Sequence, residues 1–142
     1  MGDRGSILRV WLPLLAGLFA IYAFFVLGPG PHDAIRWLGL ALCLVGLSGV
    51  IVARATLGRS FSVRAKATEL VTAGIYSRIR NPIYISSVIF LMGLILTGRR
   101  PVLALLLVVI IPMQMIRARR EAAVLEAKFG DAYREYRKRT WF

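Results

Sequence analysis

Cysteine and histidine are nearly absent from this sequence, with Cys43 and His32 the only residue of each type. A single cysteine excludes an internal disulfide and a cysteine-based zinc cluster. A single histidine, next to Asp33 in a short loop, gives no basis for a histidine-dependent triad or a metal centre. We interpret Cys43 as a packing residue of an apolar helix and His32 as an ordinary loop residue, and we expect no bound metal.

Acidic residues are scarce and apolar residues abundant. Seven Asp and Glu stand against 19 Lys and Arg, and 58% of the 142 residues are hydrophobic, above the roughly 45–50% of soluble domains. Four runs lack any charged residue and approach the roughly 17–25 residues that cross a bilayer; they cover 10–27, 37–53, 82–98 and 101–116. We predict an all-α integral membrane domain with four transmembrane helices at about 8–28, 36–53, 82–98 and 101–117.

The basic residues are unevenly distributed along the chain. All but Arg36, Arg99 and Arg100 lie before the first predicted helix, between the second and third, or after the fourth. Cytoplasmic segments of membrane proteins carry an excess of Lys and Arg. We therefore expect both termini and the segment 54–81 to be cytoplasmic. Since membrane topology explains the charge, we expect no nucleic-acid partner.

The connections between the predicted helices differ in length. The segments "GPGPHD" at 28–33 and "TGRRP" at 97–101 are short, and Pro101 suits the first turn of a helix. They predict two antiparallel hairpins. The segment 54–81 between the hairpins is longer than a plain connector requires, so we expect it to form a site loop.

The predicted cytoplasmic tail, residues 118–142, carries an apolar stripe on a charged helix. The stripe consists of Leu125, Phe129, Tyr133 and Tyr136. Gly130 is suited to end one helix and Asp131 to cap the next. Two interpretations stay open: the tail lies on anionic lipid headgroups, or it folds back over the site loop and closes a pocket.

The stretch "GIYSRIRNPIYIS" at 74–86 marks the start of the third predicted helix. The Asn81 side chain can cap the helix, and Pro82 suits its first position. The positive end of the helix dipole and Arg80 should attract negative groups. Alternatively, Arg78 and Arg80 only fix topology and bind lipid phosphates.

A carboxylate can join these arginines if the fourth helix continues past Pro112. Arg117 and Glu121 then share one helix face. Arg80 could hold a ligand carboxylate through its planar fork, and Glu121 could hold an amine or hydroxyl. From the residues alone, the expectation is a polar ligand at the cytoplasmic interface.

Two motifs in combination resemble the isoprenylcysteine carboxyl methyltransferase family, which is itself similar to the phospholipid N-methyltransferases. They are "LVTAGIYSRIRNPIYIS" at 70–86 and "RREAAVLEAKFGDAYREYRKR" at 119–139. The matching positions are Leu70, Val71, Gly74, Tyr76, Arg80, Pro82, Tyr84, Glu121, Leu125, Phe129, Gly130, Tyr133 and Tyr136. Asn81, Ala122 and Thr68 depart from the family, which has His, Glu and often His at these positions.

The resemblance implies an integral-membrane enzyme that uses S-adenosylmethionine, and we expect it in a bacterial or archaeal inner membrane. A lipophilic carboxylate, amine or thiol would accept the methyl group at the cytoplasmic interface. Arg80 and Glu121 would be the catalytic residues. The cofactor side would be lined by Leu70, Val71, Gly74, Tyr76, Asn81, Tyr84 and Glu121. Because Asn81 cannot titrate, any proton transfer by the family histidine has no equivalent here.

Two other classes of membrane protein fit the sequence less well. Membrane reductases that use NADPH look similar across the Arg-x-Pro segment, but such an enzyme needs a larger enclosure for its two ligands. A small four-helix transporter is disfavoured, because the four uncharged runs lack the ionisable residues of proton-coupled pathways.

Overall fold

The computed structural model describes residues 4–57 and 70–142 of the chain, and these residues fold into helices connected by turns. In chain order the elements are α1 (Arg4–Leu27), α2 (Ala34–Leu57), the 3-10 turn η2 (Gly74–Ser77), α3 (Pro82–Gly98), the 3-10 turn η3 (Pro101–Leu103), α4 (Ala104–Phe129) and α5 (Asp131–Arg139). The described ranges hold no β-strand, and the predicted all-helical fold is confirmed.

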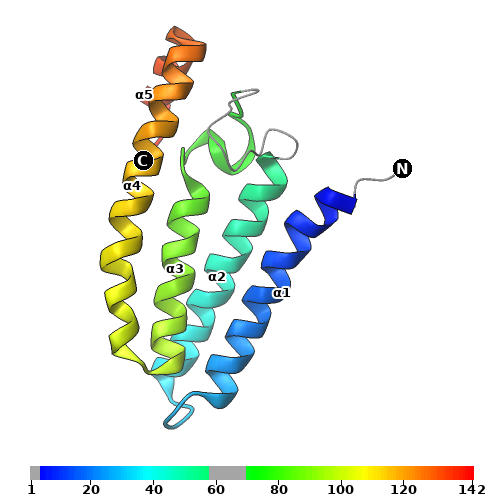
Figure 1. The fold of residues 1–142 in the computed structure, drawn as a ribbon, viewed down its shortest axis with the longest axis vertical. Helices are drawn as coiled ribbons and strands as arrows, with labels where there is room; N and C mark the ends of the chain where they lie inside the picture. Colours follow the sequence, from blue (N-terminus) through cyan, green and yellow to red (C-terminus); the bar gives the residue numbers. More distant parts are fainter. Residues whose placement is uncertain (1–3, 58–69) are drawn as a thin grey trace.

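The four long helices lie lengthwise beside one another, with α1 antiparallel to α2 and α3 antiparallel to α4 (Figure 1). The turns that join α1 to α2 and α3 to α4 lie at the lower end of the view. The C-terminal end of α2, the start of α3, η2 and α5 lie toward the upper end. The long central connection and the tail are therefore brought to the same end of the molecule.

Two helical segments are long and apolar enough to cross a membrane, Ala34–Leu57 and Pro101–Phe129. Leu14–Leu27 and Pro82–Gly98 are shorter apolar helices. Four spans and their orientation stay a prediction. The structure lengthens the second predicted helix at both ends, so Arg54 is helical and the predicted site loop begins four residues later than expected.

Helix α4 continues through Pro112 to Phe129, as predicted. Pro112 has no backbone N–H to donate and removes one hydrogen bond from the helix ladder, yet the helix does not end there. Gly130 follows with φ at +51°, a conformation that favours glycine, and α5 begins at Asp131. The unbroken α4 carries Glu121 beyond the apolar part of the helix.

Helices α2 and α3 pack with their backbones in contact. A Cβ atom added to Gly46 would lie 2.4 Å from the Phe90 nitrogen, and one added to Gly93 would lie 2.5 Å from the Cys43 nitrogen. Small residues permit such close approach between helices in membranes. Cys43 is fully buried here and packs in the core cluster, which confirms it as a packing residue. This contact holds the end of α2 beside the start of α3.

Arg36, which the sequence suggested only as a topological charge, is fully buried at the opposite end. Its guanidinium donates to the carbonyl oxygens of Phe25, Gly28 and Pro29, at 3.4, 2.9 and 2.6 Å. These oxygens lie at the end of α1, where carbonyls lack helical partners and the helix dipole is negative. Asp33 caps the start of α2 and pairs with Arg99. Arg36 therefore closes the first hairpin.

Candidate functional site

Helix α3 begins at Pro82 after Asn81, but not by the predicted side-chain cap. Asn81 makes no capping hydrogen bond through its amide, so that prediction is wrong. Its backbone lies at φ −123° and ψ 56°, outside the extended conformation typical of a capping residue. Instead, the Asn81 N–H donates to the Phe142 carbonyl oxygen at 3.0 Å. The tail, rather than the Asn81 side chain, holds the entry to α3.

The C-terminal residues run beside the chain that leads into α3. The Trp141 N–H donates to the Arg78 carbonyl at 2.8 Å, and the Arg80 N–H donates to the Trp141 carbonyl at 3.0 Å. Together they form a short parallel bridge between Ile79 and Trp141. Of the two open interpretations of the tail, folding back over the central segment is therefore confirmed. The closing of a pocket stays a prediction.

Helix α5 contributes its apolar face to the same contact. Tyr133 and Tyr136 are buried, with exposed fractions of 2% and 9%. The Tyr136 hydroxyl donates to the Tyr76 carbonyl oxygen at 2.8 Å. The tyrosines of the tail thus anchor α5 on η2.

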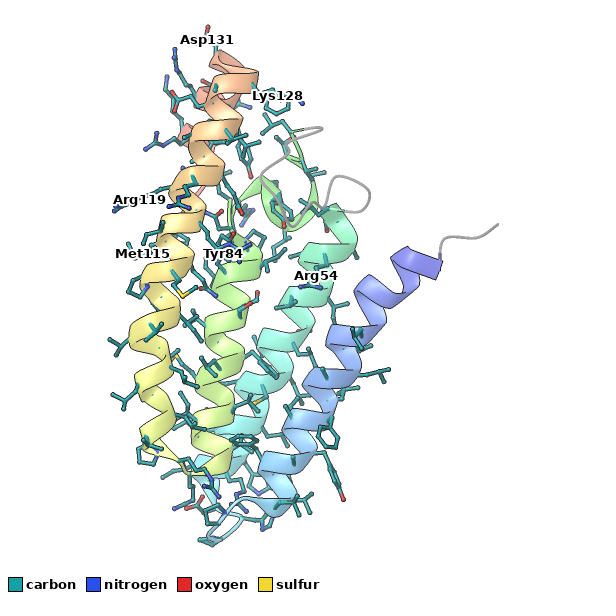
Figure 2. All side chains as sticks on the ribbon, viewed as in Figure 1. Arg54, Tyr84, Met115, Arg119, Lys128 and Asp131 are labelled. Atoms are coloured by element: carbon teal, nitrogen blue, oxygen red, sulfur yellow. The ribbon has the colours of Figure 1, made fainter. Side chains whose placement is uncertain are left out.

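Glu121 of α4 meets α3 at Tyr84. The Tyr84 hydroxyl donates to Glu121 Oε1 at 2.6 Å, a short distance that is typical of a bond to a carboxylate. Both side chains are half-buried, and Arg117, one turn before Glu121, interacts with the same hydroxyl. Figure 2 labels Tyr84 at the start of α3, on the side of α4. Two residues predicted from separate motifs, 37 positions apart, are therefore in contact.

Tyr76 is buried, and its carbonyl oxygen takes part in the contact with Tyr136. Burial raises the pKa of its hydroxyl, and Tyr136, Glu121 and Tyr84 raise that pKa further. Arg54, near the end of α2, lowers it. We call Tyr76, Tyr84, Tyr136 and Glu121 the tyrosine cluster.

The tyrosine cluster contains proton donors at neutral pH. The pKa of Tyr136 is raised to about 12 by burial and by Tyr133, with Arg80 lowering it. That of Tyr76 is raised as well. Phenols with raised pKa values stay protonated near neutral pH and can donate hydrogen bonds. The Tyr136 hydroxyl donates to the Tyr76 carbonyl oxygen, and Glu121 accepts the hydrogen bond from Tyr84.

The other predicted site residues lie around this cluster. Leu70 and Val71 are half-buried ahead of η2. Gly74 has φ at +58°, and a Cβ there would lie 3.1 Å from Thr56 Cγ2, so glycine is suited to this position. Arg80 is half-buried, with Nε 3.5 Å from the Trp141 carbonyl oxygen. Among the ion pairs of the described residues, none joins Arg80 to Glu121.

Sequence reasoning did not assign Arg54 and Tyr136 to the site. Tyr136 had a signal, because it belongs to the tail stripe and matches the second motif. Arg54 had none, since only the packing of α2 against α3 and η2 brings its charge near the Tyr76 hydroxyl. Within residues 4–57 and 70–142, no group of three or more His, Cys, Asp and Glu side chains is arranged to hold a metal ion.

The fold and site define a class: an all-helical protein with apolar helices of membrane-spanning length and a polar cluster where α3, α4 and α5 meet. The family described as phospholipid methyltransferase matches residues 34–132. The chain belongs to this family, which includes the isoprenylcysteine carboxyl methyltransferase-like proteins, so the resemblance is confirmed. It is a membrane protein of a methyltransferase family.

The chain is also similar to the nickel-cobalt-cadmium resistance protein NccN of Alcaligenes xylosoxydans xylosoxydans. The two are 33% identical over 109 residues, which cover 73% of this chain and 50% of that protein. The chain therefore spans half the length of this relative. No solved structure matches the chain.

Proposed function

We propose that this protein transfers a methyl group from S-adenosylmethionine to a lipophilic acceptor at the cytoplasmic surface of the membrane. The observation that carries the proposal is the hydrogen bond between Tyr84 and Glu121, because it joins the two motifs on which the family resemblance rests. Membership of a methyltransferase family supports the reaction class.

The residues around the tyrosine cluster fit the chemistry of this donor. One oxygen of Glu121 accepts the Tyr84 hydroxyl, and a carboxylate has further lone pairs for a ligand ammonium or hydroxyl. Leu70 and Val71 offer apolar surface, and Gly74 permits close backbone approach. When bound, S-adenosylmethionine would supply an electrophilic methyl group on a sulfonium.

The chain's own contribution would be positioning and electrostatics. Methyl transfer is an in-line displacement, and correct placement of the reactants lowers much of its barrier. A carboxylate acceptor would need no base. An amine or thiol acceptor would have to lose a proton, and Glu121 is the group of the tyrosine cluster suited to take it, since Tyr76 and Tyr136 stay protonated.

Arg80 would act on the same ligands from the segment that precedes α3. Its charge lowers the Tyr136 pKa, so it lies near that hydroxyl, and its Nε faces the Trp141 carbonyl oxygen. The planar guanidinium has further N–H groups for a carboxylate of donor or acceptor. Asn81 would contribute an amide for hydrogen bonding, without a titrating group.

The proposed location is a bacterial or archaeal inner membrane, with four spans and both termini in the cytoplasm. Helix α5 and the segment before α3 lie at the same end of the molecule, which supports this orientation, as does the uneven distribution of basic residues. A reductase and a transporter are not favoured by the family. The described residues hold no group of three or more His, Cys, Asp and Glu side chains arranged for a metal ion, so the nickel-cobalt-cadmium resistance named for the similar protein is not proposed as a second function.

The test is calorimetric titration of the full chain in nanodiscs with S-adenosylhomocysteine and, separately, with NADPH. We expect S-adenosylhomocysteine to bind and NADPH not to bind. Transfer of label from methyl-labelled S-adenosylmethionine into a lipid extract would then identify the acceptor class. Binding of NADPH, or of neither ligand, would overturn the proposal.

A further inference from the structure

A partly open groove of about 320 Å³ lies between α1, α2 and α3. This volume is at the lower end of the range of ligand sites, roughly 300–1,000 Å³. Its lining includes small and apolar side chains from all three helices: Gly17, Ala20, Leu47, Ile51, Ser87 and Phe90. Of the described residues that line it, none belongs to the tyrosine cluster. A molecule in this groove is therefore not placed against Glu121.

Arg54 gives the groove a positive charge at one end. It is the lining residue nearest the C-terminal end of α2, three residues before Leu57, so its Cα lies about 4.5 Å along the helix axis from that end. Figure 2 shows Arg54 on the upper part of α2. Ser87 also lines the groove, and its hydroxyl donates to the Ile83 carbonyl oxygen at 2.6 Å. Among the described residues that line the groove, Arg54 is the charged one.

The lining complements both parts of a phospholipid, with apolar side chains for an acyl chain and a positive charge for the phosphate. In the four-span topology proposed above, apolar walls between helices meet acyl chains rather than water, and Arg54 lies near the level of the cytoplasmic headgroups. A guanidinium at that depth attracts lipid phosphates and can bind them through more than one N–H. A zwitterionic lipid carries a compensating positive charge in its headgroup, so an anionic lipid complements Arg54 better.

We propose that the groove between α1, α2 and α3 is a binding site for an anionic phospholipid, with one acyl chain between the helices and the phosphate on Arg54. The groove adjoins the tyrosine cluster through Arg54 but is lined by none of its residues, and lipid binding there does not depend on methyl transfer. Because the charge of Arg54 also acts on the Tyr76 hydroxyl, a bound phosphate would change the field at the tyrosine cluster. The lipid composition of the membrane would then influence the cluster.

The experiment is native mass spectrometry of the full chain in detergent, titrated without cofactor with palmitoyl-oleoyl phosphatidylglycerol or phosphatidylcholine. We expect phosphatidylglycerol to bind about fivefold more tightly, the effect of one basic residue at a membrane surface. Arg54→Gln should abolish this preference, whereas Arg54→Lys should keep it because the charge remains. Arg100→Gln, an exposed arginine at the opposite end, should leave the preference unchanged.

Groove filling provides an independent test that leaves Arg54 in place. Val50 lines the groove, and Val52 lies on the same helix with 50% of its surface exposed. Val50→Phe should weaken binding of both lipids, and Val52→Phe should not. Equal binding of the two lipids by the unchanged protein, or equal behaviour of the two valine variants, would overturn the proposal. A lipid-free dimer in which the second copy fills the groove would also overturn it. If Arg54→Gln lost methyl transfer but bound phosphatidylglycerol as before, the proposal would fail as well, and Arg54 would be assigned to binding of the methyl acceptor.

Discussion

Glu121 is the residue on which the candidate site is centred. It is half-buried, and its carboxylate accepts the Tyr84 hydroxyl at 2.6 Å. Tyr84 therefore holds one oxygen of Glu121, so that a ligand meets a carboxylate of fixed orientation.

Replacement of Tyr84 by phenylalanine tests this orientation. Tyr84→Phe keeps the ring and removes the donor, so we expect affinity for S-adenosylhomocysteine to fall by roughly 10- to 100-fold, the effect of a hydrogen bond to a charged group. Calorimetry in nanodiscs measures the change. Tyr22→Phe is the matched control, because Tyr22 lies on α1 with 59% of its surface exposed. Equal affinities of the two variants would contradict a positioning role for Tyr84.

Arg80 can be compared directly with Arg78, its neighbour in the same segment. Arg78 is exposed, whereas Arg80 is half-buried beside Tyr136 and the Trp141 carbonyl. Lysine keeps the positive charge but lacks the planar fork. We expect Arg80→Lys to reduce methyl transfer about tenfold or more, as for one lost charged hydrogen bond. Arg78→Lys should transfer normally. If both variants are fully active, the arginines act only in topology.

At the scale of elements, α5 and the residues after it determine the shape of the site. Tyr136 bonds to the backbone of η2, while Trp141 and Phe142 bond to the backbone before α3. These contacts join the tail to the segment that carries the first motif. A ligand that touches both parts would bind only when α5 is docked.

Deletion of residues 131–142 tests the dependence on α5 while leaving Glu121 and all of α4 in place. The unchanged protein should gain thermal stability with S-adenosylhomocysteine, about 2.7 kcal/mol at a ligand concentration 100 times Kd. The deletion should lose this gain. Lys138→Ala, at an exposed position of α5, should retain it. A full stability gain in the deleted protein would show that α5 is not required for binding.

At the scale of the whole molecule, orientation in the membrane decides which solvent reaches the tyrosine cluster. Asp131 is exposed at the end of the molecule that holds the tyrosine cluster, and Arg100 is exposed in the turn at the opposite end. In a background with Cys43→Ala, single cysteines can be placed at 131 and at 100. Cytoplasmic termini predict labelling of position 100 in intact cells and of position 131 only after permeabilisation. Labelling of position 131 from outside would reverse the proposed topology.

The sequence by itself determined the helical class, the continuation of α4 past Pro112 and the pairing of two motifs in one family. These features follow from local patterns, because apolar length, proline position and motif spacing depend on neighbours along the chain. The Asn81 prediction was wrong for a non-local reason: the backbone of Asn81 pairs with Phe142 and leaves the conformation in which its side chain would cap α3.

Only the tertiary structure decided which polar and charged groups meet. It buried Arg36 against the end of α1, joined Tyr84 to Glu121 and brought the charge of Arg54 to Tyr76. No spacing along the chain encodes these contacts, because each depends on how two or three helices pack. The close approach of α2 and α3 at Gly46 and Gly93 is the physical reason that the polar side chains at their ends share one site.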